Sequence, residues 1–261
     1  MLKDRKKPMQ TKINSYTGVL KDPTLDLLVG KALLDATNTE KELRTPSGKL
    51  SASMLWWPLQ WQVLKTIGLG GAPFDEYTLR KFERGHHVEK WLVEQMPGVI
   101  SEQKLIEYRG AIGYADAIVD SAGYQLRMGI IPHEVKSVSN AKFKRIVTQG
   151  QPDMGHIYQA CFYAMGTKSK FFAIDYVSTD DYRIETYVLP TEKYAKNIDE
   201  TIDRFNRAMR DWEDKKIVPV FVANEKWQAT VNYNNFPTFM KLTEKEASEL
   251  AVKMLGGGEI V

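Results

Sequence analysis

An acidic and a basic side chain stand close together in a segment that otherwise has the pattern of a β-strand. In residues 130–138 (IIPHEVKSV), Glu134 and Lys136 are two positions apart. They would therefore share one face of a strand, with Val135 on the other. A carboxylate and an ammonium inside an apolar strand cost free energy unless each has a partner. An exposed edge strand with a surface ion pair explains the two residues as well as a reactive site does, so both interpretations stay open.

Two further acids lie in apolar surroundings. Asp116 stands among small and apolar residues of 112–120, and aspartate is depleted in strands. A polar outward face and a functional role explain Asp116 equally well. Glu89 falls on the apolar stripe of a predicted helix over 75–96, where a glutamate usually has a cation beside it: arginine, lysine or a metal ion. His86 is on the same stripe, and we interpret it as a core histidine.

A polar pair occurs on another helix, predicted over 154–166. Gln159 and Tyr163 are four residues apart and share one helix face. They form either a buried hydrogen-bonded pair or part of a site. The position of the pair alone does not decide between these two interpretations.

Together the acids form a set of hard oxygen donors. Asp116, Glu134 and Glu89 suit Mg²⁺ or Mn²⁺ better than zinc. Lys136 adds a positive charge without binding a metal. This combination is the equipment for metal-assisted hydrolysis of a phosphodiester, in which the metal polarises a phosphoryl oxygen and the lysine stabilises negative charge or orients water.

In their order along the chain, these pieces resemble the PD-(D/E)XK nuclease superfamily, in its RecB-type and phage-type exonuclease branch. The resemblance covers about residues 51–190 and consists of Gly85-x-x-x-Glu89, Gly113-x-x-Asp116, Glu134-x-Lys136 and Gln159-x-x-x-Tyr163. It implies a restriction-endonuclease-like α/β core, a central mixed β-sheet flanked by helices. It also implies a metal-dependent DNA exonuclease acting at a DNA end in recombination, repair or phage DNA processing. A structure-specific endonuclease and a catalytically silent DNA-binding scaffold are the alternatives.

The resemblance also implies a role for each residue. The implied catalytic residues are Asp116, Glu134, Lys136, Glu89, Gln159 and Tyr163. The implied ligands of Mg²⁺ or Mn²⁺ are Asp116, Glu134, the Val135 carbonyl and Glu89. Many RecB-type members have histidine at the position of Glu89, whereas phage exonucleases often have glutamate, which favours the phage-type subgroup. The single cysteine, Cys161, excludes the four-cysteine iron–sulfur cluster of some relatives, so we expect no iron–sulfur cluster.

Basic residues follow the predicted lysine of the site. Lys136, Lys142, Lys144 and Arg145 lie within ten residues that contain no acid. This window is either a solvated loop or, beside a phosphodiesterase site, an electrostatic guide for a DNA backbone. The predicted nucleic-acid contacts are Lys142, Lys144, Arg145, Gln159 and Tyr163. The expected partners are single- or double-stranded DNA ends, with a recombinase or a single-strand-binding protein as a further candidate. The sequence does not indicate an oligomeric state.

The elements that must position these residues follow from the hydrophobic pattern. Besides the two helices above, we expect helices over 24–37, 191–215 and 243–255, and one that begins near Ser51 or Ser53 and meets Pro58. The expected strands are 99–109, 112–120, 130–138, 171–177 and 183–189. The tryptophans of the 51–67 segment are predicted core residues. This order of elements favours one α/β core over 51–218, with extensions over 1–50 and 219–261.

Composition sets the outer limits. The chain has 261 residues, of which 43% are hydrophobic and 26% charged, with a formal net charge of +3. These values exclude a mostly disordered chain and a disulfide-stabilised miniprotein, and the charge alone does not indicate a nucleic-acid binder. No apolar stretch reaches the roughly 18 residues of a membrane span, and no signal peptide precedes the core. We therefore expect a cytoplasmic protein without membrane contact.

Overall fold

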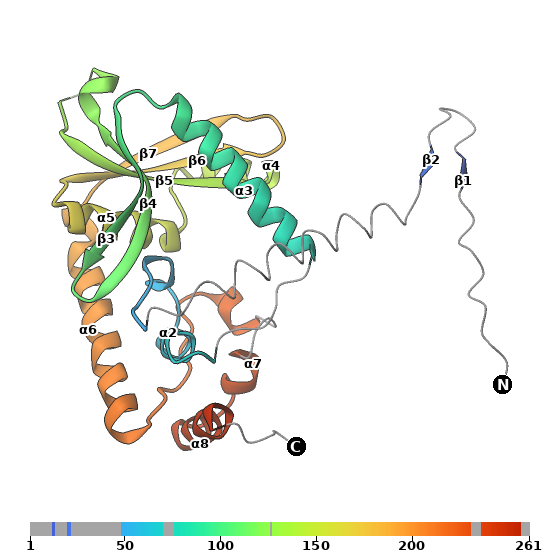
Figure 1. The fold of residues 1–261 in the computed structure, drawn as a ribbon, viewed down its shortest axis with the longest axis vertical. Helices are drawn as coiled ribbons and strands as arrows, with labels where there is room; N and C mark the ends of the chain where they lie inside the picture. Colours follow the sequence, from blue (N-terminus) through green and yellow to red (C-terminus); the bar gives the residue numbers. More distant parts are fainter. Residues whose placement is uncertain are drawn as a thin grey trace. The chain divides into compact units, whose positions relative to one another are not determined.

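The computed structural model describes residues 12–13, 20–21, 48–69, 76–125, 127–230 and 236–256 (Figure 1). The chain forms two compact units: residues 1–45 with 74–82, and residues 46–73 with 83–261. In the first unit, β1 (Lys12–Ile13) pairs with β2 (Leu20–Lys21), and helix α3 (Glu76–Gln95) begins there before it continues into the second. The helix predicted over 24–37 lies outside the described residues.

The second unit contains a five-stranded mixed sheet. In spatial and sequence order its strands are β3 (Val99–Tyr108), β4 (Ala111–Asp120), β5 (Ile130–Val138), β6 (Phe171–Ser178) and β7 (Ile184–Pro190). Neighbouring strands are antiparallel except β5 and β6, which are parallel. That parallel pair needs a crossover, and α4 (Asn140–Gln149) and α5 (Met154–Thr167) supply it. The predicted fold class, a mixed sheet flanked by helices, is confirmed.

The central strands β4, β5 and β6 bury side chains on both of their faces. Phe172 and Ile174 of β6 pack in the same cluster as α5. Val135 and Val177 belong to the cluster on the other face, where α3 contributes its apolar side chains, Val88, Leu92 and Val93. Because side chains alternate along a strand, this division places Glu134 and Lys136 on the α5 side. His86 is exposed on α3, so its predicted place in the core is wrong.

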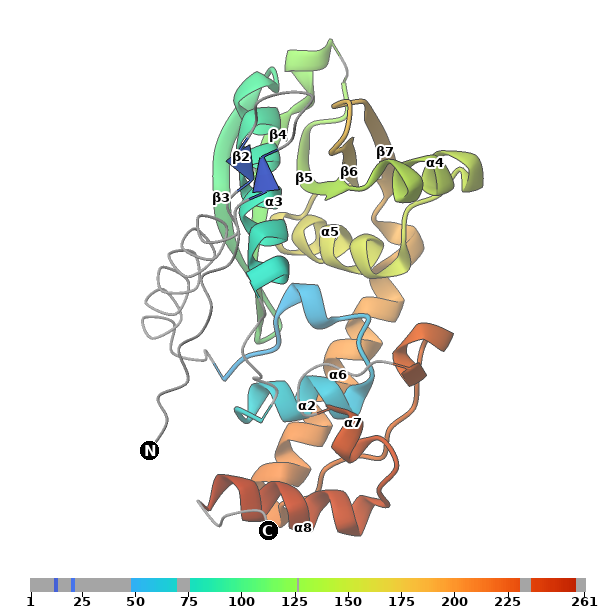
Figure 2. The same ribbon diagram turned by 90° about the vertical axis from the view of Figure 1, so that its right-hand side faces the viewer.

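A second apolar cluster lies where α6 (Glu192–Lys215) extends beyond the sheet. It joins α6 to α2 (Leu59–Thr66), α7 (Phe236–Phe239) and α8 (Glu244–Leu255), which lie together in Figure 2. At its centre the rings of Trp61 and Phe236 stack, with centroids 4.8 Å apart and planes 7° apart. Trp61 is fully buried, as predicted for the core. Residues after 218 therefore belong to the same compact unit as the sheet.

Two local predictions need correction. The helix expected near Ser51 is interrupted: a short 3-10 turn, Ala52–Met54, comes first, and α2 begins only after Pro58, whose ring cannot continue a helix. In the basic window, for which a solvated loop was one interpretation, Lys142, Lys144 and Arg145 lie on helix α4, which Ser139 caps at its start and Gly150, at φ +64°, ends. No helix in the described part of the chain is long and apolar enough to cross a membrane.

The close contact between β4 and α5 generates a stability prediction. A Cβ atom at Gly113 would lie 2.6 Å from Cβ of Ala52 and 2.8 Å from the Tyr163 ring. We expect Gly113→Ala to lower the free energy of unfolding by roughly 1–3 kcal/mol, because an overpacked core must shift. Chemical denaturation measures this change. The matched control is Gly85→Ala on α3, where the added Cβ meets only Ser137 Oγ at 3.4 Å. Equal stability of the two variants would contradict the prediction.

Candidate active site

The site forms where β4 and β5 separate, a feature that we call the strand fork. The two strands pair from Asp120↔Ile130 to Ala117↔His133, and their pairing ends there. At the next position Oδ2 of Asp116 accepts a hydrogen bond of 2.7 Å from the backbone N–H of Val135. The carboxylate thus takes the place of a strand partner for a buried donor. Because N–H and C=O of one strand residue point to the same side, the Val135 carbonyl also faces the fork.

Glu134 and Lys136 lie beside Asp116 on β5. The ammonium of Lys136 donates to Oε1 of Glu134. The Glu134 side chain is 1% exposed and that of Lys136 is 27% exposed. In the described part of the structure, Oε2 of Glu134 is buried and has no hydrogen-bond partner. A buried carboxylate oxygen in this state carries a large desolvation penalty, which a bound cation would relieve.

Glu89 reaches the same place from α3. Its carboxyl group and that of Asp116 share a hydrogen bond. The side-chain amide of Gln103 donates to Glu89 and, at 3.3 Å, to Oδ1 of Asp116. Gln103 has φ +44° in the middle of β3, a conformation that costs a non-glycine residue free energy. The sequence analysis missed Gln103, because neither its residue type nor its spacing signals a strained position opposite Asp116.

The polar pair of α5 closes the α5 side of the fork. Gln159 Nε2 donates to the Tyr163 hydroxyl at 3.0 Å, and Tyr163 is 1% exposed. Burial, and then the charge of Glu134, raise the pKa of Tyr163, so its hydroxyl keeps its proton. The glycine of Gly113-x-x-Asp116 gives this ring its room on β4. The pair is therefore both hydrogen-bonded and adjacent to the acids, which joins the two interpretations that the sequence left open.

The electrostatics of the fork are those of excess negative charge. Burial raises the pKa of Glu134 to about 8 and that of Glu89 to about 7, and it also raises the pKa of Asp116. Burial by itself would lower the pKa of Lys136, but the carboxylates around it outweigh this effect and raise it. Three carboxyl groups face one ammonium, so protons or a cation must balance the charge.

The donor set fits Mg²⁺ or Mn²⁺. In the described ranges no three His, Cys, Asp or Glu side chains are grouped closely enough to hold a metal ion by themselves. Mg²⁺, however, is usually bound through one or two carboxylates, with water completing its shell. Asp116 and Glu134, with its unpaired Oε2 and the neighbouring Val135 carbonyl, offer that kind of set. Glu89 hydrogen-bonds to Asp116 and Gln103 at its edge.

A cavity of about 740 Å³ adjoins the fork, and Lys136 and Gln159 contribute to its lining. Lys142 and Arg145 of α4 line it too, and both are ion-paired with Asp153 at 2.9 Å. Lys144 is exposed and is not one of the lining residues. Asp153, which follows the basic window, is a partner that the sequence analysis did not identify.

Comparisons with known proteins find similar folds at low sequence identity. No model of a known protein family matches the sequence, and no curated protein matches it. The chain is similar to the crystal structure of an alkaline exonuclease from Laribacter hongkongensis, at 15% identity and a TM-score of 0.46, over 63% of this chain and 89% of that one. It is also similar to a phage-related exonuclease from Haemophilus somnus, at 13% identity and a TM-score of 0.42, over 61% and 92% of the two chains.

The raised pKa values predict how stability depends on pH. Glu134 binds a proton up to pH about 8 in the folded protein, but only up to about 4.5 when unfolded. The folded state thus holds more protons between these values, and the metal-free protein should lose stability as pH rises through them. At pH 8, Glu134→Gln should be more stable than the unchanged protein by roughly 2 kcal/mol, since one pKa unit corresponds to about 1.4 kcal/mol and neighbouring acids share the effect.

Denaturation in EDTA at pH 5 and pH 8 measures this difference. The control is Glu102→Gln, which removes an exposed carboxylate from β3. If Glu134→Gln were less stable than the unchanged protein at pH 8, or if Glu102→Gln had the same effect, the electrostatic description of the fork would be wrong.

Proposed function

We propose that this protein is a Mg²⁺- or Mn²⁺-dependent nuclease that hydrolyses phosphodiester bonds of DNA from an end. The observation that carries the proposal is the fork itself. A buried carboxylate with an unpaired oxygen, a second carboxylate and a lysine meet beside a cavity with a basic wall. Exonuclease action, and a setting in recombination, repair or phage DNA processing, rest on the motif resemblance.

In this proposal Asp116, Glu134 and the Val135 carbonyl hold the metal ion. A bound Mg²⁺ or Mn²⁺ supplies Lewis-acid polarisation of the phosphoryl group and lowers the pKa of bound water. Glu89 keeps Asp116 in position through their shared hydrogen bond and through the amide of Gln103. The acids are buried away from water, which strengthens their attraction for a cation.

Lys136 acts on the substrate. Its ammonium is held at the fork by Glu134 and is partly exposed toward the cavity. A phosphate entering from the cavity would meet this charge, which orients the attacking water or stabilises the negative charge of the transition state. Gln159 also lines the cavity, and its side-chain amide donates to the hydroxyl of the buried Tyr163, which positions it.

Cleavage of end-labelled linear DNA tests the proposal. With Mg²⁺ or Mn²⁺ we expect shortening from one end, and none in EDTA. Lys136→Ala and Asp116→Asn should lower the rate by about 100-fold or more, the usual effect of removing a group that stabilises the transition state. Lys196→Ala, which removes an 86%-exposed lysine of α6, should leave the rate unchanged.

Covalently closed circular DNA distinguishes the two modes of cleavage. An exonuclease leaves it intact, whereas cutting of the circle would replace the exonuclease proposal with an endonuclease. Full activity in the Lys136 variant would contradict the assignment of the site, and binding of DNA without cleavage in either metal would favour a silent scaffold.

A further inference from the structure

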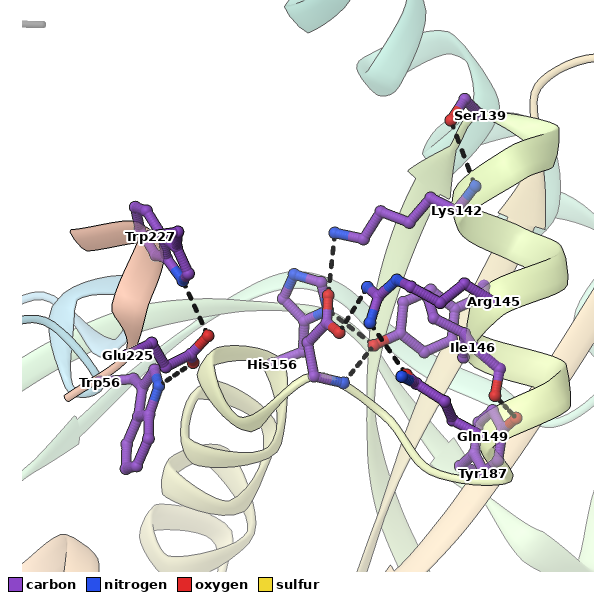
Figure 3. A network of polar contacts seen from close by, with 12 residues as sticks. Trp56, Ser139, Lys142, Arg145, Ile146, Gln149, His156, Tyr187, Glu225 and Trp227 are labelled. Carbon is purple, nitrogen blue, oxygen red and sulfur yellow. Dashed lines mark hydrogen bonds and ion pairs between the residues drawn. The ribbon is translucent and has the colours of Figure 1, made fainter. Parts of the chain in front are cut away.

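The cavity beside the fork has a second wall that the proposed reaction does not use. This wall is largely aromatic: Trp56, Trp57 and Trp227 line it, together with Glu225. Figure 3 shows Trp56 and Trp227 on one side, Lys142 and Arg145 of α4 on the other, and His156 between them. The fork contributes Lys136 and Gln159 to the same cavity. A strand held at the fork would therefore lie between a basic surface and an aromatic one.

Trp227 is held in a defined orientation although it is 46% exposed. Its indole N–H donates to Oε2 of Glu225 at 2.8 Å, and the indole of Trp56 donates to Oε1 of the same carboxylate. The ring also lies 6.4 Å from the buried Trp61. The polar edge of Trp227 is thus satisfied within the protein, which leaves apolar ring surface to meet a ligand.

The loop that carries Trp227 is fixed to the first aromatic segment. The side-chain oxygen of the fully buried Gln228 accepts from the backbone N–H groups of Asn224 and Glu225, at 2.7 and 3.0 Å. The side-chain amides of Gln228 and Asn224 both donate to the carbonyl of Trp56. Two of these hydrogen bonds lie within the loop. Three polar contacts, counting the Trp56–Glu225 bond, therefore hold the loop against a segment about 170 residues earlier. Because the loop is already ordered, it loses little conformational entropy when its tryptophan contacts a ligand.

The opposite wall carries positive charge and a neutral imidazole. Lys142 and Arg145 share one partner, Asp153, so this wall carries two cations and one anion, and the second carboxylate of the cavity, Glu225, lies beside the tryptophans. The Tyr176 hydroxyl accepts from the N–H of Asp153 at 3.1 Å and forms a hydrogen bond of 2.7 Å with Nδ1 of His156. Burial, and then the nearby lysines, lower the pKa of His156 to about 3. Its imidazole is therefore neutral at pH 7.

An exposed, fixed tryptophan opposite paired cations is the arrangement that binds single-stranded nucleic acid, with a base on the ring and phosphates on the cations. Paired bases within a duplex do not offer their faces to a side chain. A cavity of about 740 Å³ also has the size of a small-ligand site, which suits terminal nucleotides rather than a double helix.

We propose that Trp227 stacks on an unpaired base next to the scissile phosphate, and that the protein therefore takes DNA with a single-stranded end in preference to a blunt duplex. Lys142 and Arg145 hold the backbone of that strand. That the bound strand is the one cleaved rests on the proposed function. That a single strand binds in the cavity does not.

Binding in EDTA tests the proposal without cleavage. The probes are a fluorescein-labelled dT12 strand and a labelled blunt hairpin duplex, measured by anisotropy. Trp227→Ala should weaken dT12 binding by about 5- to 150-fold, the range found when one base–aromatic stack is removed. Trp227→Phe should retain most of the affinity, and hairpin binding should change little in either variant. The matched control is Trp91→Ala, since Trp91 is a 38%-exposed tryptophan of α3 that contacts Tyr182 and does not line the cavity.

The outcomes distinguish a failure of the proposed stacking site from a failure of the proposed nuclease activity. If the unchanged protein cleaves DNA but Trp227→Ala binds dT12 normally, the stacking site is wrong and the nuclease stands. If no DNA is cleaved in Mg²⁺ or Mn²⁺ while dT12 binding depends on Trp227, the cavity is a single-strand site and the nuclease proposal fails. Equal losses for dT12 and the hairpin would overturn the preference for an unpaired end, and so would an equal loss in Trp91→Ala. Thermal denaturation of each variant confirms that it is folded.

Discussion

The hydrogen bond from the Val135 N–H to the Asp116 carboxylate is the interaction on which the site depends. It lets β4 and β5 separate without leaving a buried donor unsatisfied, and groups from both sides of the sheet meet at this opening. Glu89 arrives from α3, and Gln159 and Tyr163 come from α5.

The fork weakens the metal-free fold. Buried acids with raised pKa values and a strained Gln103 all oppose folding at neutral pH. The apolar clusters on both faces of the sheet, together with the stacked rings of Trp61 and Phe236, offset this loss. A cation that binds only the folded state would add stability by mass action. Stability and function are therefore coupled at one point of the sheet, through the same carboxylates.

The sequence predicts what local patterns determine. The strands that carry Asp116 and Glu134 begin and end within a residue of their predicted bounds, because apolar alternation is a local property. Helix α4 was not predicted, since its charges obscured an apolar face formed by Phe143 and Ile146. The position of Gln103 opposite Asp116 depends on its strained backbone and on the register of β3 and β4, and no short sequence motif encodes either one. Trp227 gains its place only when its loop returns to a segment about 170 residues earlier.

The most direct test of the central claim, that the fork acids form a cation site, is calorimetric titration of Mn²⁺ into the protein at pH 7.5 in two buffers of different ionisation enthalpy. We expect binding with release of about one proton, because the cation displaces protons that the buried carboxyl groups hold. Asp116→Asn and Glu134→Gln should abolish that binding, while Glu102→Gln should retain it. Binding that persists unchanged in the fork variants, or no binding to the unchanged protein, would contradict the account.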